Sequence, residues 1–153
     1  MADRNVPYGP FNFLVSIDGG RDPNSFLGGF AEVSGITHEL TIAEYRNGNE
    51  RENHVRKVSG IHKVGDVTLK RGVVNSADLW QWIEQARTTG PNAKRQVVIT
   101  MIDEAGAPVQ SWKLRGVVPM KYTGPSLNAK GGTDVAMEEL VLSAEALDLE
   151  ALT

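Results

Sequence analysis

Side chains that could do chemistry are few in this sequence, and they are not arranged as a catalytic group. The three histidines, His38, His54 and His62, are far apart along the chain and have no companion ligand motif. No nucleophile with a base, no pair of carboxylates and no phosphate-binding loop is recognisable. The absence of cysteine excludes disulfides, thiolate metal sites and cysteine nucleophiles. We therefore expect no catalytic residue, no metal, no cofactor and no enzyme activity.

The aromatic residues and glycine pairs that could bind a base, a sugar or a phosphate have structural explanations instead. Trp82 falls on the apolar stripe of a predicted helix, and Trp112 alternates with Leu114 in a predicted strand, so we expect both in the core. Trp80 lies off that stripe and is expected at an interface. The glycine pairs at 19–20, 28–29 and 131–132 do not join a strand to a helix as a phosphate loop would, and they predict turns or bulges.

Length and composition indicate one folded domain covering residues 1–153. The chain is 41% hydrophobic and 23% charged, which is ordinary for a globular protein. Residues 1–10 are polar and contain Asp3 and Arg4, where a secretory signal needs an apolar core, so we expect synthesis in the cytoplasm. No run approaches the roughly 18–20 apolar residues of a membrane-spanning helix, so we expect no stable membrane insertion.

Charge is distributed unevenly along the chain. The net charge of -3 argues against a general nucleic-acid-binding protein. Residues 46–71 contain seven basic and three acidic side chains, whereas residues 134–150 contain six acidic side chains and no basic one. The two segments either pair, within one subunit or between copies, or form two solvated faces that do not interact.

Apolar residues recur with a period of two over most of the chain, which predicts a mainly β protein. A turn is expected at 19–25, a hairpin connection at 103–107, and a long polar loop at 46–60, which we expect to be functional because of its length. Pro119 is expected to interrupt its strand. The predicted strands lie at residues 11–18, 30–33, 36–45, 64–70, 96–102, 109–114 and 117–122.

One segment, at about residues 76–87, has helical periodicity. Asn75 or Ser76 is expected to cap the helix, with Asp78 in its first turn, and Gly90 and Pro91 should end it. Its apolar stripe consists of Leu79, Trp82, Ile83 and Ala86.

The C-terminal segment at residues 134–152 has two interpretations. Its alanine, glutamate, leucine and methionine content favours a helix by propensity. A strand also fits, with Leu140 and Leu142 facing one way and Glu139 and Glu145 the other. The residues alone slightly favour the helix.

Short motifs spread over nearly the whole chain resemble the tail-tube protein family of contractile-tailed phages and phage-derived contractile injection systems. Each motif is weak, but their common order is specific. They are Phe11–Asp18, Phe30–Ile36, Glu44–Gly48, Gly65–Gly72, Leu79–Trp82, Trp112–Leu114, Pro119–Pro125 and Leu127–Ala129.

This resemblance implies a small antiparallel β-barrel or sandwich with one flanking helix, similar to the type VI secretion tube protein Hcp. It also implies that residues 135–144 form a strand, and that interpretation replaces the helix, because a sheet context can overrule propensity. Six copies would form a ring, and rings would stack head to tail. The inter-ring loop would contain Arg46, Asn47, Gly48, Glu50, Arg51, Glu52, Arg56 and Lys57, facing a complementary acidic surface of Asp134, Glu138, Glu139 and Glu145.

The family therefore implies a structural subunit of an inner tube that a contracting sheath drives through a target envelope. The expected partners are further copies of the chain, a surrounding sheath protein, baseplate or spike and terminal cap proteins, and a cargo of effector protein or DNA in the channel. The expected location is a phage tail or an injection particle assembled in the bacterial cytoplasm. The alternatives are a monomeric ligand-binding β-barrel and a tube-initiating baseplate paralogue.

Overall fold

A computed structural model describes residues 5–9, 12–17, 29–73, 78–132 and 134–151. The turn expected at 19–25 and the helix cap expected at Asn75 or Ser76 lie outside these residues. Along the chain the elements are β1 Phe13–Ile17, β2 Glu32–Ser34, β3 His38–Tyr45, β4 Arg56–Val64, β5 Val67–Gly72, α1 Asp78–Thr89, the 3-10 helix η1 Gly90–Ala93, β6 Arg95–Ile102, β7 Pro108–Thr123, β8 Met137–Ser143 and β9 Ala146–Ala151.

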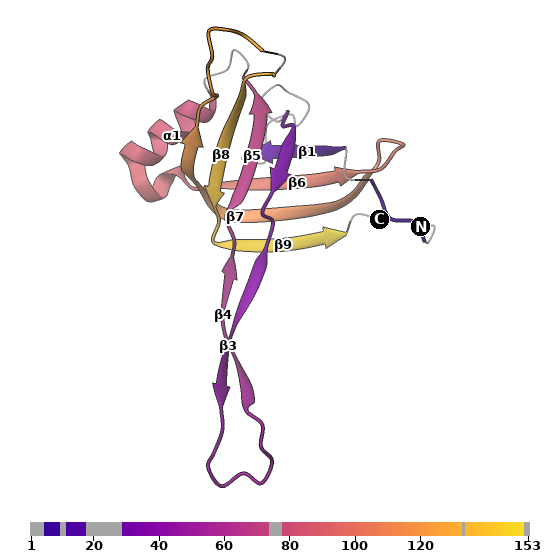
Figure 1. Cartoon of the computed structure of the whole chain (residues 1–153), viewed down its shortest axis with the longest axis vertical. Helices are drawn as coiled ribbons and strands as arrows, with labels where there is room; N and C mark the ends of the chain where they lie inside the picture. Colours follow the sequence, from indigo (N-terminus) through magenta and orange to yellow (C-terminus); the bar gives the residue numbers. More distant parts are fainter. Residues whose placement is uncertain (1–4, 10–11, 18–28, 74–77, 133, 152–153) are drawn as a thin grey trace.

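Seven strands form one antiparallel sheet in the order β1-β6-β7-β8-β5-β2, with β9 also paired to β7. The first half of β7 pairs with β6 and β9, and its second half pairs with β8. The sheet therefore folds back on itself as two layers of crossing strands, and α1 lies at one side (Figure 1). The predicted class, mainly β with one flanking helix, is confirmed, as an open sandwich rather than a closed barrel.

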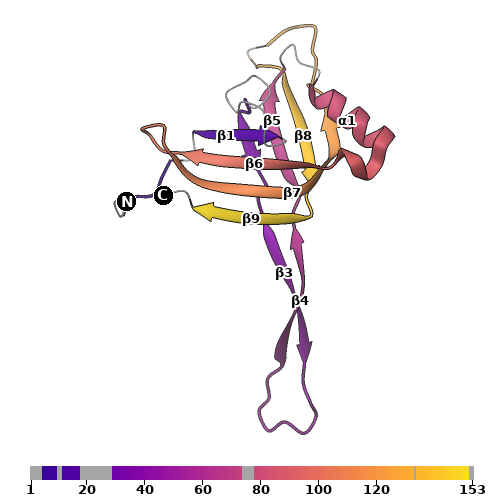
Figure 2. The same cartoon turned by 180° about the vertical axis from the view of Figure 1, so that it is seen from behind.

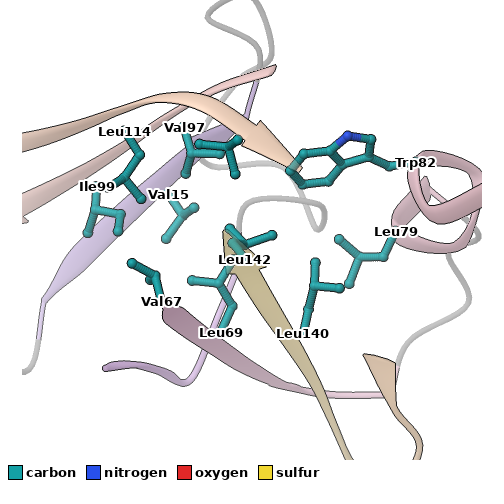
Figure 3. Packing of buried hydrophobic residues seen from close by; sticks show 11 residues of the cluster. Val15, Val67, Leu69, Leu79, Trp82, Val97, Ile99, Leu114, Leu140 and Leu142 are labelled. Atoms are coloured by element: carbon teal, nitrogen blue, oxygen red, sulfur yellow. The ribbon is translucent and has the colours of Figure 1, made fainter. Parts of the chain in front are cut away.

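The core lies between the two halves of the sheet. Val15, Val97 and Leu114 come from the β1-β6-β7 half and meet Leu69 and Leu140 from the β5-β8 half (Figure 3). The hydrophobic effect supplies most of the stabilisation here, at about 1.5–3 kcal/mol for each large side chain removed from water. The period-two alternation in the sequence corresponds to this inward-facing set.

The predicted helix is confirmed at Asp78–Thr89, and Trp82 is its main contribution to the core. Its side chain is buried, and the indole Nε1 donates a hydrogen bond to the carbonyl oxygen of Ala93 at 2.9 Å. This bond satisfies the one polar atom of the ring and joins α1 to η1. Trp112, as predicted, packs half-buried against the same core.

The C-terminal segment forms two strands, so its helical propensity is misleading. Leu140 and Leu142 of β8 stand opposite Leu69 and Val67 of β5, which places four apolar side chains in one buried layer. Strand β9 then adds to β7 through six residue pairs, from Gln110↔Ala151 to Arg115↔Ala146. Burial on the sheet outweighs a propensity of a few tenths of a kcal/mol per residue.

Pro119 does not interrupt its strand, because β7 runs through it without a break. A β-bulge lies between Pro119 and Lys121, where the register with β8 shifts. Pro119 stands opposite Leu142 and the next residue, Met120, has no partner, so the proline lies beside a local irregularity of the ladder, where its missing N–H does not break the strand. Gly116, with φ of 63°, precedes it in the region where β7 passes from one set of partners to the other.

Strands β3 and β4 form a separate two-stranded ribbon that projects away from the body (Figures 1 and 2). We call residues 38–64 the arm. The loop predicted at residues 46–60 is too long, because Arg56–Gly60 belong to β4. Pairing with β3, for example Ala43↔Val58 and Glu44↔Lys57, extends the ribbon into that segment. The connecting loop is limited to residues 46–55.

Candidate assembly interface

The arm is the part of the described chain with the least burial. Every residue of β3 is exposed, and in β4 only Val64 is partly covered. Among the described strands, none pairs with either edge of this ribbon. An isolated two-stranded hairpin is marginally stable in water at best, and a bare strand edge invites pairing with another chain.

Large apolar side chains are exposed along the arm. Ile61 is 80% exposed, and Tyr45 and Val58 are each more than half exposed. Leu40, Ile42 and Val55 are also exposed. Single exposed apolar residues are normal, but six on one narrow ribbon indicate a surface that another protein covers.

Two glycines fix the direction in which the arm leaves the body. Gly35 has φ of 84°, a region that favours glycine, and a Cβ placed on it would lie 2.4 Å from the carbonyl oxygen of Asp66. A Cβ on Gly65 would lie 1.9 Å from Oγ1 of Thr37, and the Gly65 N–H donates to the Thr37 carbonyl at 3.1 Å. At Gly35 the backbones therefore lie closer together than any larger residue would allow, whereas at Gly65 a larger residue would require the Thr37 side chain to move.

The tip of the arm is organised by its own side chains. The Arg46 guanidinium donates to the carbonyl oxygens of Glu50 and Glu52 at 3.2 and 3.4 Å. Glu50 forms an ion pair with Arg56 at 3.1 Å. Among the residues that the structure describes, Arg51 and Lys57 have no ion-pair partner, so the tip presents positive charge to solvent.

The eight predicted inter-ring residues therefore divide by position. Arg46, Asn47, Gly48, Glu50, Arg51 and Glu52 lie in the tip loop, and Arg56 and Lys57 lie on β4. Sequence reasoning missed the apolar side chains of the arm. Their signal in β4 is weak, because a register shift within the ribbon breaks the period of two: Val58 pairs with Ala43, whereas Val64 pairs with His38, on the other face of β3.

The four predicted acidic residues do not form one exposed surface. Asp134 is exposed between β7 and β8, and Glu139 lies on β8 opposite Lys70. Glu145 lies beyond the far end of β8 and forms an ion pair with Lys94. Glu138 is buried inside the sandwich. Strand geometry explains this separation, because β8 alternates its faces and spans about 20 Å.

Glu138 belongs to a buried polar cluster. Its Oε1 accepts a hydrogen bond from Nε of Arg71 at 2.5 Å, and its Oε2 accepts one from the Tyr122 hydroxyl at 2.8 Å. The guanidinium also lies over the Phe30 ring, 5.7 Å from its centroid. The hydrogen bond to Glu138 is the main reason why the pKa of Tyr122 is raised, with burial adding to it. The cluster joins β5, β7 and β8, which is a structural role.

The histidines form no metal site among the described residues. The rings of His38 and His62 lie side by side across the arm, with centroids 5.1 Å apart, and His54 pairs with Glu52. In the described ranges no group of three histidine, cysteine, aspartate or glutamate side chains could hold a metal ion. Over the same residues, no helix is long and apolar enough to cross a membrane.

Trp80, expected at an interface, is half exposed on α1. Its ring meets the Tyr122 ring edge-on, with centroids 5.9 Å apart. Its role in contact between chains stays a prediction.

Comparison with known proteins places the chain in a family. The model of the T4-like virus tail tube protein gp19 family matches residues 9–148. Among curated proteins the sequence has no match. A chain from the sheath-tube complex of an extracellular contractile injection system, PVC, in its extended state is 25% identical, with a TM-score of 0.81, and the match covers 97% of this chain and 94% of that one.

Two further solved structures show the same fold. A chain from the PVC sheath/tube terminator is 25% identical with a TM-score of 0.81, and the match covers 96% of this chain and 99% of that one. Hcp1 from Flavobacterium johnsoniae is 13% identical with a TM-score of 0.52, and the match covers 90% of this chain and 93% of that one. The likeness to Hcp1 shows the fold alone.

Proposed function

The chain belongs to the T4-like virus tail tube protein gp19 family, and from that premise we propose that six copies close into a ring and that rings stack head to tail into a hollow tube. The chain is a structural tube subunit rather than an enzyme, and a component of a phage tail or an injection particle. The ring size, the direction of stacking and the role of the arm are what we propose beyond membership of the family.

The observation that carries the proposal is the arm itself. A ribbon with exposed apolar side chains and two bare edges is unfavourable in an isolated chain and favourable once a second copy covers it. A contact between different surfaces of identical copies is heterologous, and such contacts build rings or open stacks instead of closed dimers. The positive tip would contact the next ring.

The similar solved structures support the partners. They include chains from a sheath-tube complex, from a sheath/tube terminator and from the anti-feeding prophage baseplate, and the baseplate chain is 24% identical with a TM-score of 0.77. We therefore propose that a sheath surrounds the tube, that baseplate and cap proteins bind its ends, and that effector protein or DNA passes through the channel.

A position at one end of the tube is the second candidate function. The chain from the PVC tube terminator and the chain from the sheath-tube complex have the same identity and TM-score to this protein. A terminating or initiating subunit would form a single ring, whereas the main tube subunit would continue to grow.

The experiment is electron microscopy of the purified chain at micromolar concentration, with light scattering for mass. Long tubes are expected for the main subunit, and single rings would identify an end subunit. A protein that stays monomeric at low and high salt contradicts the proposal and favours the ligand-binding alternative.

A further inference from the structure

We infer that a groove at the end of the molecule opposite the arm receives the distal arm of a copy in the adjacent ring. This inference rests on the proposed head-to-tail stacking and adds the surface that the arm contacts.

The groove lies between the connection from β7 to β8 and the start of β8. It has a volume of about 650 Å³ and includes Leu127, Asp134, Val135 and Met137 in its lining. Leu127 is 83% exposed and Val135 is 72% exposed. Exposed apolar side chains around a concave surface indicate that another protein fills it.

The distal arm offers side chains of matching character. Ile42, Tyr45 and Val58 are exposed on the strands beside the tip loop, and Val55 is exposed at the end of the loop itself. Removing such side chains from water contributes about 25 cal/mol for each Å² of apolar surface. Groove and arm are therefore both unfavourable when exposed, and both are stabilised by contact with each other.

The positions of the two surfaces suit a stack. In Figures 1 and 2 the arm extends from one end of the long axis, and the connection between β7 and β8 lies at the other end. Copies stacked head to tail keep one orientation, so an arm that leaves one ring meets the opposite end of the next. β3 alone is 8 residues long, so it reaches about 26 Å.

Charge favours the same contact. Asp134 lies in the lining of the groove, and the basic side chains of Arg51 and Lys57 near the tip have no ion-pair partner within the described part of the chain. An opposite charge at each side would orient the arm as it enters.

A second apolar cavity is a poorer receptor. Phe13, Val33, Ile99 and Trp112 line it, and its volume is about 250 Å³. These residues belong to β1, β2, β6 and β7 and pack against the core, and β1, β6 and β7 run across the long axis within the body of the molecule (Figure 1). An arm directed along the stack would pass it by.

Disulfide trapping tests this inference, because the chain has no cysteine of its own. One variant combines Val55→Cys with Leu127→Cys, and a second combines Val58→Cys with Val135→Cys. All four positions are exposed, so folding should be preserved. The matched control combines Val55→Cys with Ala105→Cys, which lies in the exposed turn between β6 and β7.

Assembled tubes are oxidised and run on a non-reducing gel. Arm-to-groove contact predicts a ladder of covalent multimers in at least one of the two test variants, because each chain is joined to the next, and no ladder in the control. Tubes without a ladder in either variant, or with an equal ladder in the control, overturn the inference and leave the tube assignment intact. Failure of the unmodified chain to assemble refutes the proposed stacking itself.

Discussion

Removing one partner of the buried pair between Arg71 and Glu138 should destabilise the fold strongly, whereas replacing both should not. The two side chains are 3% and 9% exposed, so water screens their interaction little. Glu138→Gln removes the carboxylate that accepts the hydrogen bond of the buried Arg71 Nε, and Arg71→Met removes the guanidinium that faces the buried Glu138 carboxylate. The loss of one partner of such a pair costs about 3–5 kcal/mol.

The double variant Arg71→Met with Glu138→Leu removes both charges and fills a similar volume. Replacing a buried ion pair by apolar residues is often neutral or stabilising. We therefore expect the free energy of unfolding of the double variant to lie within about 1 kcal/mol of the parent value. The Tyr122 hydroxyl loses its acceptor, but the residue is 37% exposed, so water can replace that bond. The two substitutions should therefore be strongly non-additive.

Urea unfolding, followed by circular dichroism and tryptophan fluorescence, measures these differences. Dilute, unassembled protein is required, because assembly stabilises the folded chain by mass action. For a chain of 153 residues, 1 kcal/mol shifts Tm by about 2–4 °C, so each single variant should melt about 6–20 °C lower. The reasoning would be refuted if each single variant lost less than about 1 kcal/mol of unfolding free energy, or if the double variant lost as much as the two single variants added together.

Three further predictions concern pH, the arm root and the arm tip. Because the pKa of Tyr122 is raised in the folded state, the hydroxyl stabilises the fold fully below pH 10, and this contribution is lost as the pH rises through the folded-state pKa. The difference in unfolding free energy between the parent and Tyr122→Phe, measured by urea titrations at several pH values, should therefore shrink only above pH 10. A change in that difference near neutral pH would contradict this cause. Gly35→Ala should lower the free energy of unfolding by at least about 1–2 kcal/mol and impair assembly, because Gly35 has a positive φ and its added Cβ would meet the Asp66 carbonyl oxygen. Gly48→Ala is the neutral control, because a Cβ there would have no atom within 4 Å. Equal Tm values for the two variants would show that the root of the arm does not require glycine. Charge reversal of Arg51 and Lys57 to glutamate should shorten the tubes in electron micrographs without changing the circular dichroism spectrum, because each exposed ion pair between rings contributes about 0.2–1 kcal/mol and the loss is multiplied over a ring. High salt should shorten tubes of the parent in the same way. Variant tubes of full length would show that the tip charges do not join rings.

Local sequence determined the elements whose stability depends on near neighbours. The helix at Asp78–Thr89 follows from the spacing of Leu79, Trp82 and Ile83, and it ends where Gly90 takes φ of 59°. The hairpin between β6 and β7 follows from Asp103, whose side chain accepts hydrogen bonds from the backbone N–H groups of Ala105 and Ala107. These contacts lie within a few residues of each other along the chain.

The sequence also determined the kind of protein. The missing catalytic group and the ordered motifs between Phe11 and Ala129 indicated a tube subunit before any contact was known, and the family match over residues 9–148 agrees.

The tertiary structure decided what depends on partners distant in sequence. Strand β8 overrules its helical propensity because Leu69 and Val67, some seventy residues earlier, bury its leucines. Glu138 changes from a predicted surface charge to a buried one because β8 faces Arg71 there. The arm is longer and its loop shorter than predicted because β3 pairs with Arg56–Val64. Cross-strand pairing and burial are long-range, and no local pattern in the chain contains them.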